Sequence, residues 1–283
     1  MYKKDCYTPS PSIDLHYSHG AFEKNSNLNY LHYDKDLIIE FYRIGESEIH
    51  IEGNHYHITE GDMVILNPDE IHVSTRKDGV YFEKIVLHIK DSLLSPFGGD
   101  RNTFFDSLSN KPKGMGNLIP KEKVKELGLD QTVNYCLSLA EKGDFEAQML
   151  ITCKTVELLS ELSKLTKNPE VTNKYVSTNK TVNTIIEYIN KHYTENITLE
   201  FLSNKFHFSK YHIAHLFKQN VGISPYDYLI IRRLYVCNNL IRANYTVKEA
   251  CYSVGFHNYS NFYRLYKKHL NITPQQFKGT IKT

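Results

Sequence analysis

The sequence of 283 residues predicts an α+β protein in which an N-terminal antiparallel β-barrel with helices is followed by an all-α domain. Three observations carry this prediction. Apolar residues alternate with a period of two through residues 12–90, which is typical of half-buried strands. Beyond residue 121 the apolar spacing becomes helical. Within residues 198–277 one helix–turn–helix pattern occurs twice, and a long helix joins the two copies.

The alternating segments are short and bounded by turn residues. Leu37, Ile39 and Phe41 form one alternating set, and residues 85–89 form another. Turn signals separate the segments, at Gly45, Gly53-Asn54, Gly61-Asp62 and Asn67-Pro68. Short strands at this spacing favour an antiparallel sandwich or a small barrel.

The helical part begins near Lys121. Its apolar positions advance by alternating steps of four and three, at Ile151, Thr155, Leu158, Leu162 and Leu165. This is the spacing of a coiled-coil seam, over about two heptads. Two interpretations stay open, a contact between subunits through residues 121–165 and a helix packed on its own barrel.

A polar segment follows over residues 166–180, contains Pro169 and has no apolar period, which is typical of a linker. We therefore expect a first domain over residues 1–165, a linker over 166–180 and a second domain over 181–283.

The two helix–turn–helix copies are in register at a separation of 49 residues, since Phe217 and Pro225 of the first correspond to Tyr266 and Pro274 of the second. The expected helix N-caps are Ser209, Ser224 and Asn258, and Thr273-Pro274 is expected to start the last helix. A long helix after Ser224 carries an apolar stripe suited to joining two lobes, at Ile230, Leu234, Cys237 and Ile241. Two such units at a fixed separation can enter neighbouring major grooves, about 34 Å apart on one face of a duplex.

Charge is distributed unevenly along the chain. The net charge is +2, yet residues 1–173 carry 19 Lys and Arg against 27 Asp and Glu, a net of −8, whereas residues 174–283 carry 15 against 5, a net of +10. A basic C-terminal part beside an acidic N-terminal part indicates a polyanionic partner for the C-terminal part alone.

The five cysteines show no paired spacing, and Cys153, Cys237 and Cys251 lie in apolar helical patterns, so we expect buried reduced thiols there. The N-terminus lacks the apolar core of a signal peptide, and no apolar stretch is long enough to span a bilayer. We expect a cytoplasmic protein.

A recognition helix needs an apolar inner face, an outer face of hydrogen-bonding side chains and positive charge near the phosphates. Arg264 is the candidate for a bidentate contact with guanine, and Lys218 and Lys267 are placed to neutralise phosphates. The full set of outer-face candidates is Lys210, Tyr211, Ala214, His215 and Lys218 in the first unit, and Tyr259, Ser260, Tyr263, Arg264 and Lys267 in the second.

Residues 180–280 resemble the C-terminal DNA-binding domain of AraC/XylS-type transcription regulators. The resemblance is carried by Leu216-Phe217-Lys218, Gly222-Ile223-Ser224-Pro225, Gly255-Phe256, Ser260-Asn261-Phe262 and Thr273-Pro274. It implies that bases or the sugar–phosphate edge are contacted by Tyr211, Ala214, His215, Tyr259, Ser260, Tyr263 and Arg264. The sequence departs from the pattern at His207 and Asn271, where glycine is usual, and at His215, where arginine is frequent.

Residues 32–74 resemble the cupin-like effector domain of the same family, through Gly45, Ile49-His50-Ile51-Glu52-Gly53, Tyr56, Gly61-Asp62, Asn67-Pro68 and His72. The resemblance implies an effector-binding and dimerisation domain. Polar side chains among apolar ones can hold an organic ligand in such a barrel. The candidates are Tyr30, His32, Glu40, Tyr42, His72 and Glu83.

The favoured hypothesis is a sequence-specific DNA-binding transcription regulator, an activator on the strength of the resemblance. Its expected partners are promoter DNA, a small-molecule effector, a second copy of the chain and RNA polymerase, with no metal and no cofactor. One alternative is a metal-dependent cupin enzyme with an accessory helical domain, for which His32, Asp34, Glu40 and His72 are the available ligands. A third hypothesis is a constitutive DNA-binding protein whose barrel only dimerises.

Overall fold

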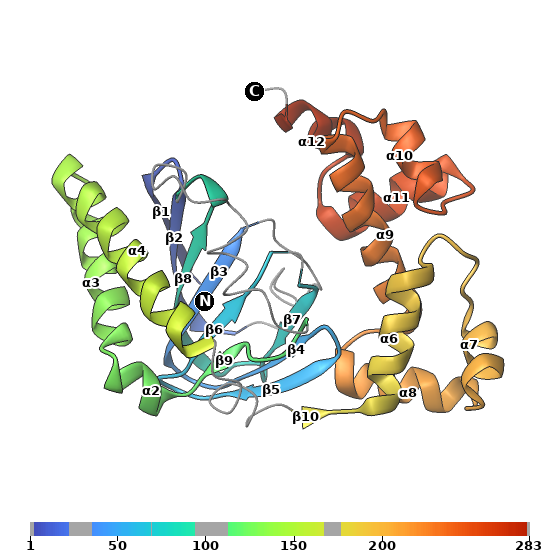
Figure 1. Cartoon of the computed structure of the whole chain (residues 1–283), viewed down its shortest axis with the longest axis horizontal. Helices are drawn as coiled ribbons and strands as arrows, with labels where there is room; N and C mark the ends of the chain where they lie inside the picture. The colour runs from blue at the N-terminus through green and yellow to red at the C-terminus, as the bar shows by residue number, and fades with distance from the viewer. Residues whose placement is uncertain (1–2, 23–35, 69, 94–112, 167–176, 282–283) are drawn as a thin grey trace. The chain divides into compact units, whose positions relative to one another are not determined.

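The computed structural model describes residues 3–22, 36–68, 70–93, 113–166 and 177–281, which form two compact units (Figure 1). Unit 1 consists mainly of the chain up to Ser177, and unit 2 mainly of the chain from Thr178 onwards. This division falls within the predicted linker at 166–180. The bounds of the linker stay a prediction, because residues 167–176 lie outside the described residues.

Unit 1 contains two sheets. The larger is antiparallel, and its strand order is β1-β2-β8-β3-β6-β9. In the smaller sheet β5, β4 and β7 lie side by side, and β4 and β5 form a hairpin. The strands are β1 Lys3–Ser10, β2 Ile13–Ala21, β3 Leu37–Ile44, β4 Ser47–Ile51, β5 Asn54–Ile58, β6 Met63–Leu66, β7 His72–Thr75, β8 Tyr81–Ile89 and β9 Leu118–Ile119.

Side chains on β3 and β8 alternate between two cores because successive residues of a strand point to opposite faces. Ile39 and Leu87 belong to the core shared with the helices of unit 1. Ile38 and Val86 belong to the core between the two sheets, which we call the barrel interior. The buried apolar residues of the barrel interior are Ile38, Tyr42, Ile49, Ile51, Tyr56, Ile58, Val64, Leu66, Val86 and Leu118.

Three helices complete unit 1: α2 Lys121–Glu126, α3 Leu129–Lys142 and α4 Phe145–Thr166. Figure 1 shows α3 and α4 along the face of the larger sheet that is opposite to the barrel interior. The predicted seam lies on the buried side of α4, where Ile151, Leu158 and Leu162 pack in the core of unit 1. The seam is therefore occupied by α3 and the sheet of the same domain, and it is not free for a partner subunit.

One expectation about α4 is wrong. Cys153 is exposed, although its apolar neighbours suggested burial. It lies two residues after Ile151, and two residues correspond to more than half a helical turn, so the side chain points away from the core. Cys237 and Cys251 are buried as expected, and burial raises the pKa of the Cys237 thiol to about 12.

The described chain from Lys180 onwards is helical, and the short strand β10 Ser177–Thr178 precedes it. The expected N-caps are confirmed: Ser209, Ser224 and Asn258 each accept a hydrogen bond from the backbone N–H three residues on. The helices are α6 Lys180–His192, α7 Leu199–Phe206, α8 Lys210–Val221, α9 Pro225–Arg242, α10 Val247–Ser253, α11 Tyr259–Leu270 and α12 Pro274–Ile281.

The two units together confirm the α+β class and the order of its parts, strands first and helices second. In the part of the chain that the structure describes, no helix combines the length and the apolar character needed to cross a membrane.

Candidate nucleic-acid interface and barrel interior

Helices α7 and α8 form the first helix–turn–helix unit. Ile213 and Phe217 on α8 are fully buried in a core that also contains Leu202 of α7. The turn between them passes through His207, which is left-handed at φ 58° and ψ 35°. The left-handed conformation is unfavourable for a residue with a Cβ, which explains why glycine is usual at this position.

Helices α10 and α11 form the second helix–turn–helix unit, and the turn between them requires glycine. Gly255 has φ +88°, and a Cβ built on it would lie 2.4 Å from the backbone oxygen of Thr194. Thr194 belongs to the loop between α6 and α7, so the second turn is packed against the first half of unit 2. Phe262 and Tyr266 bury the inner face of α11 completely.

The outer faces of α8 and α11 carry the predicted polar side chains towards solvent. Tyr211 is 82% exposed, and its ring is nearly parallel to that of His215. Arg264 is exposed and donates from Nη2 to Oδ1 of Asn261 at 3.0 Å. The other candidates are exposed or partly exposed: Lys210, Ala214, Lys218, Tyr259, Ser260, Tyr263 and Lys267. Geometry therefore leaves every predicted contact residue accessible.

Two candidates also hold local structure. The ammonium of Lys218 donates to the carbonyl oxygen of Gly222 at 2.8 Å, and thus caps the C-terminus of α8. The hydroxyl of Tyr259 accepts a hydrogen bond from Nε2 of Gln275 at 2.8 Å, which ties α11 to α12. Both side chains remain at the surface, so a phosphate could exchange for these local partners.

Helix α9 spans both helix–turn–helix units. Its residues Leu229 and Ile231 pack with the first unit, whereas Ile230 and Leu234 pack with the second. An α-helix of 18 residues is about 27 Å long, comparable with the about 34 Å between successive major grooves.

Arg233, a buried residue of α9, holds the loop before α7, a role that the sequence did not indicate. Its Nε and Nη2 donate to the backbone oxygens of Tyr193 and Glu195, both at 2.7 Å. Its guanidinium also lies 5.5 Å from the centre of the Phe256 ring, in the second turn. Arg233 therefore joins the two helix–turn–helix units through groups that are distant in sequence.

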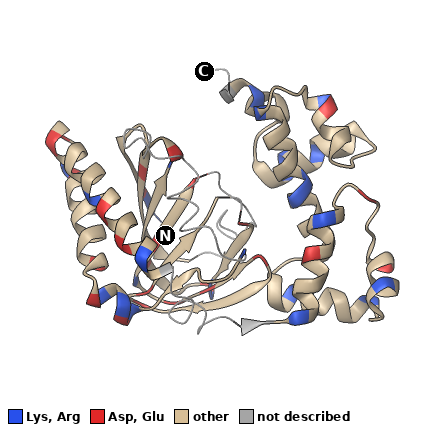
Figure 2. Cartoon of the chain, in the orientation of Figure 1, with Lys and Arg blue, Asp and Glu red and all other residues tan. Residues whose placement is uncertain are grey.

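Positive charge dominates unit 2, as Figure 2 shows for helices α6 to α12. Several of its acidic side chains are engaged locally. Glu249 closes a capping box with Thr246, and Glu200 lies 3.1 Å from Nζ of Lys210. The predicted attraction to a polyanion thus rests on exposed Lys and Arg side chains with few competing carboxylates.

The barrel interior holds a buried ion pair. The carboxylate of Glu40 contacts Nζ of Lys84 and accepts a hydrogen bond of 2.7 Å from the hydroxyl of Tyr42. Burial alone would raise the pKa of the Glu40 carboxyl, but Lys84, Tyr42 and Arg76 together lower it to about 2. Glu40 is therefore ionised at neutral pH.

Among the effector candidates, the structure brings Glu40 and Tyr42 together, and His72 is buried as well. Glu83 is a correction: it shares the opposite face of β8 with Ile85 and Leu87, outside the barrel interior. There it accepts hydrogen bonds from the hydroxyls of Tyr17 and Tyr81. Alternation alone does not indicate which of the two sets of β8 side chains faces inwards. Tyr30 and His32 lie outside the described residues.

The ligand set of the metal-enzyme alternative is not assembled among the described residues, where no group of three candidate ligands occurs. Glu40 is already bound by Lys84 and Tyr42. His72 is described, whereas His32 and Asp34 lie outside the described residues.

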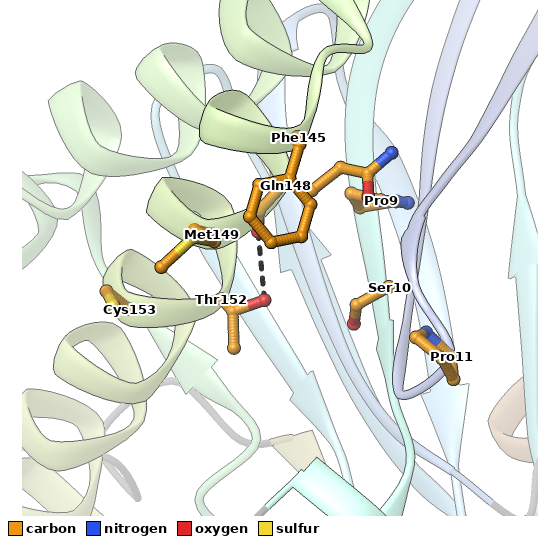
Figure 3. A pocket seen from close by; sticks show the side chains of 8 residues that line it. All are labelled: Pro9, Ser10, Pro11, Phe145, Gln148, Met149, Thr152 and Cys153. Atoms are coloured by element: carbon orange, nitrogen blue, oxygen red, sulfur yellow. Dashed lines mark hydrogen bonds between the residues drawn. The ribbon is translucent and has the colours of Figure 1, made fainter.

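A groove of about 310 Å³ lies on the outside of unit 1, between the end of β1 and the start of α4 (Figure 3). Phe145 and Met149 line it and are 75% and 56% exposed. Pro9 and Pro11 form its other wall. None of the predicted effector residues lines this groove, so it is separate from the barrel interior.

Two domain families match the chain. The AraC-like ligand binding domain matches residues 29–94, and a helix-turn-helix domain matches residues 202–280. The chain is 23% identical over 265 residues to the HTH-type transcriptional regulator YbfI of Bacillus subtilis, across 89% of this chain and 86% of that protein. It is 22% identical over 261 residues to the lactose operon transcription activator of Staphylococcus xylosus, across 90% and 87%.

Other similarities are partial or weak. The chain is 32% identical over 109 residues to the HTH-type transcriptional regulator YdiP of Escherichia coli, and that match spans 38% of this chain but only 36% of YdiP. A crystal structure of an apo ToxT variant from Vibrio cholerae covers 96% of this chain and 98% of its own at 14% identity, with a TM-score of 0.40. That low score adds nothing to the sequence matches.

A sheet domain that matches a ligand-binding family, followed by a paired helix–turn–helix domain, defines the class of two-domain transcription regulators. The chain belongs to the AraC-type family of helix–turn–helix regulators.

Proposed function

We propose that the chain binds promoter DNA sequence-specifically, with α8 and α11 in neighbouring major grooves. The observation that carries this proposal is the pair of recognition helices, whose apolar faces are buried and whose polar faces are exposed. The cores that bury the two apolar faces both contain residues of helix α9. The surplus of Lys and Arg over Asp and Glu in residues 174–283 supports binding to phosphate.

Within this interface the outer-face residues divide by chemistry. Arg264 can donate two parallel hydrogen bonds to guanine, and Tyr211, His215, Ser260 and Tyr263 can contact base edges or sugar. Lys210, Lys218 and Lys267 act on phosphates. Ala214 contributes an apolar contact, such as one with a thymine methyl, and Tyr259 supports α11.

The chain acts as a regulator without catalysis, in the cytoplasm, and activates transcription in response to a small molecule bound by unit 1. Support comes from the match to the ligand-binding family and from the activator among its relatives. Tyr30, His32, Glu40, Tyr42 and His72 remain the proposed effector contacts. Since only differential affinity can shift an equilibrium, the effector must bind more tightly to one arrangement of the protein than to another.

A second copy of the chain and RNA polymerase are the proposed protein partners. Because the seam of α4 is buried, a homodimer contact through this helix must use its outer side. Phe145 and Met149 give that side an exposed apolar character, next to the groove between β1 and α4. Exposed apolar patches of this kind are typical of protein interfaces.

The variant Arg264→Ala tests the mode of DNA reading. We expect it to weaken binding to a specific fragment by about 1–3 kcal/mol and to relax the preference at one base pair. The matched variant Lys267→Ala, one turn further along α11, should weaken binding to all sequences alike. Competition assays with base-substituted fragments distinguish the two patterns. An unchanged preference in Arg264→Ala would refute its role in base reading.

A further inference from the structure

Arg76 lies at one end of the barrel interior, directly after β7. This end is built from the turn between β3 and β4 and from the start of β8. Gly45 in the turn is packed so closely on Tyr81 and Phe82 that a Cβ would lie 2.8 Å from the backbone oxygen of Tyr81. The hydroxyl of Ser47 donates to the backbone oxygen of Thr75 at 3.4 Å, which holds β7 beside β4. The position of Arg76 is therefore set by rigid neighbours.

Two donors of the Arg76 guanidinium have no acceptor. Among the residues that the structure describes, none accepts a hydrogen bond from its Nε or its Nη2, although both atoms are buried. Buried polar groups are nearly always paired, so such donors call for a ligand, an ion or a water. Nε–H and Nη2–H point in parallel from one edge of the guanidinium, and this edge matches the two oxygens of a carboxylate.

Aromatic rings hold the guanidinium in place. Its central carbon lies 4.2 Å from the centre of the Phe82 ring and 5.6 Å from that of Tyr42. Phe22 packs edge-on against Phe82. Stacking on rings restricts the rotation of the guanidinium and leaves its edge free for hydrogen bonds. The same rings offer apolar surface to the body of an organic ligand.

The charges at this end do not balance. Glu40 is ionised, but its two oxygens are engaged by Lys84 and Tyr42. The group of Arg76, Lys84 and Glu40 carries two positive charges and one negative charge, so one more negative charge makes it neutral. A monoanion fits this requirement better than a dianion, because any excess buried charge is costly in an interior of low dielectric constant.

We propose that the Nε–Nη2 edge of Arg76 binds the carboxylate of a small organic acid whose apolar part lies against Phe82 and Tyr42. This inference deepens the proposed function by naming the chemical class of the effector, and it rests on that function only for the consequence in transcription. Arg76 is not among the residues that the sequence singled out, because an arginine just after a short strand is usually a surface residue.

The test compares acids with their neutral amides. Acetate, propionate and benzoate are titrated into the full chain against acetamide, propionamide and benzamide at constant ionic strength, with calorimetry and the thermal unfolding midpoint as readouts. We expect at least one acid to bind saturably, about tenfold or more tightly than its amide, because a charge-assisted bidentate pair is lost in the amide. Inorganic phosphate serves as a dianionic comparison.

Three variants assign the effect to Arg76. Arg76→Gln removes the positive charge and the two parallel N–H donors, so it should abolish the preference for the acid over the amide. Arg76→Lys keeps the charge but lacks the two parallel donors, so it should retain only part of that preference. Arg43→Gln is the matched control, since Arg43 lies over the Tyr17 ring beside Glu83, on the other face of the sheet. It should bind the acid as the wild type does. Unfolding midpoints without ligand show whether each variant is folded.

Several results would overturn the proposal. They are the absence of a saturable response to every acid, equal affinity for acid and amide, stabilisation by phosphate alone, and binding that survives in Arg76→Gln. If no acid binds, an ordered water satisfies the two donors. DNA affinity is measured separately, with and without the bound acid. An acid that binds through Arg76 but leaves DNA affinity unchanged would reject effector control while leaving this site intact.

Discussion

Glu40 and Lys84 place opposite charges in the barrel interior, between the two sheets of unit 1, where both residues are almost fully buried. Breaking such a pair on one side leaves a buried charge without a partner, which costs more free energy than the pair itself contributes. Alternation along β3 was enough to single out Glu40 from the sequence. Lys84 was not predictable, because lysine is almost never fully buried unless it is paired, and the pairing depends on the register of β3 with β8.

The variant Glu40→Gln should lower the free energy of unfolding by about 3–5 kcal/mol, since Lys84 then stays buried and unpaired. The double variant Glu40→Leu/Lys84→Met removes both charges and should regain much of that loss. Glu48→Gln is the surface control, because Glu48 is 41% exposed and pairs with His55. Its effect should stay within about 1 kcal/mol. Urea unfolding monitored by circular dichroism measures all three; equal losses for Glu40→Gln and Glu48→Gln would contradict this view of the pair.

The same carboxyl predicts a pH dependence. Its pKa is about 2 in the folded chain, below the usual 4.5. The unfolded chain therefore takes up the proton first as the pH falls. The stabilisation from Glu40 is complete above about pH 4.5 and disappears as the pH approaches 2. Comparing wild type with the double variant across this window isolates the contribution.

At the scale of elements, capping and turn residues were readable from the sequence, whereas the partner of an amphipathic face was not. The caps at Ser209, Ser224 and Asn258 follow from local chemistry alone. The seam of α4 had the spacing of a coiled coil, but the same spacing serves a helix packed on a sheet. Only the tertiary arrangement decides that Ile151 and Leu158 lie in the core of unit 1, where α4 packs on α3 and β1.

The turn of the second helix–turn–helix unit depends on Gly255. Gly255→Ala forces a Cβ into the backbone of Thr194 at a positive φ, so it should lower the free energy of unfolding by more than about 1 kcal/mol and weaken DNA binding. Gly279→Ala is the control, because Gly279 lies in α12 with nothing within 4 Å of an added Cβ. A helical alanine there should be neutral or stabilising by up to about 1 kcal/mol. Similar losses for both variants in thermal unfolding would contradict the close approach to Thr194.

At the scale of the whole molecule, the order of the domains and the charge asymmetry were predictable because they are properties of long segments. A repeat with an offset of 49 residues can be recognised even when the bounds of the individual helices are predicted wrongly. The effector site was less predictable. A ligand cavity is assembled from several strands, and a slip of one residue in register exchanges the inward and outward faces, as Glu83 illustrates. The roles of Arg76 and Arg233 were not predictable for the same reason, since their partners come from distant segments.

We propose above all that the two recognition helices of unit 2 bind duplex DNA through its phosphates and bases. The most direct test is the affinity for a specific promoter fragment measured over a series of salt concentrations. We expect log K to fall linearly with log salt, with a slope of about −0.9 for each phosphate neutralised, and we expect Lys267→Ala to make the slope shallower by about one unit. A slope near zero, or one that Lys267→Ala leaves unchanged, would contradict it.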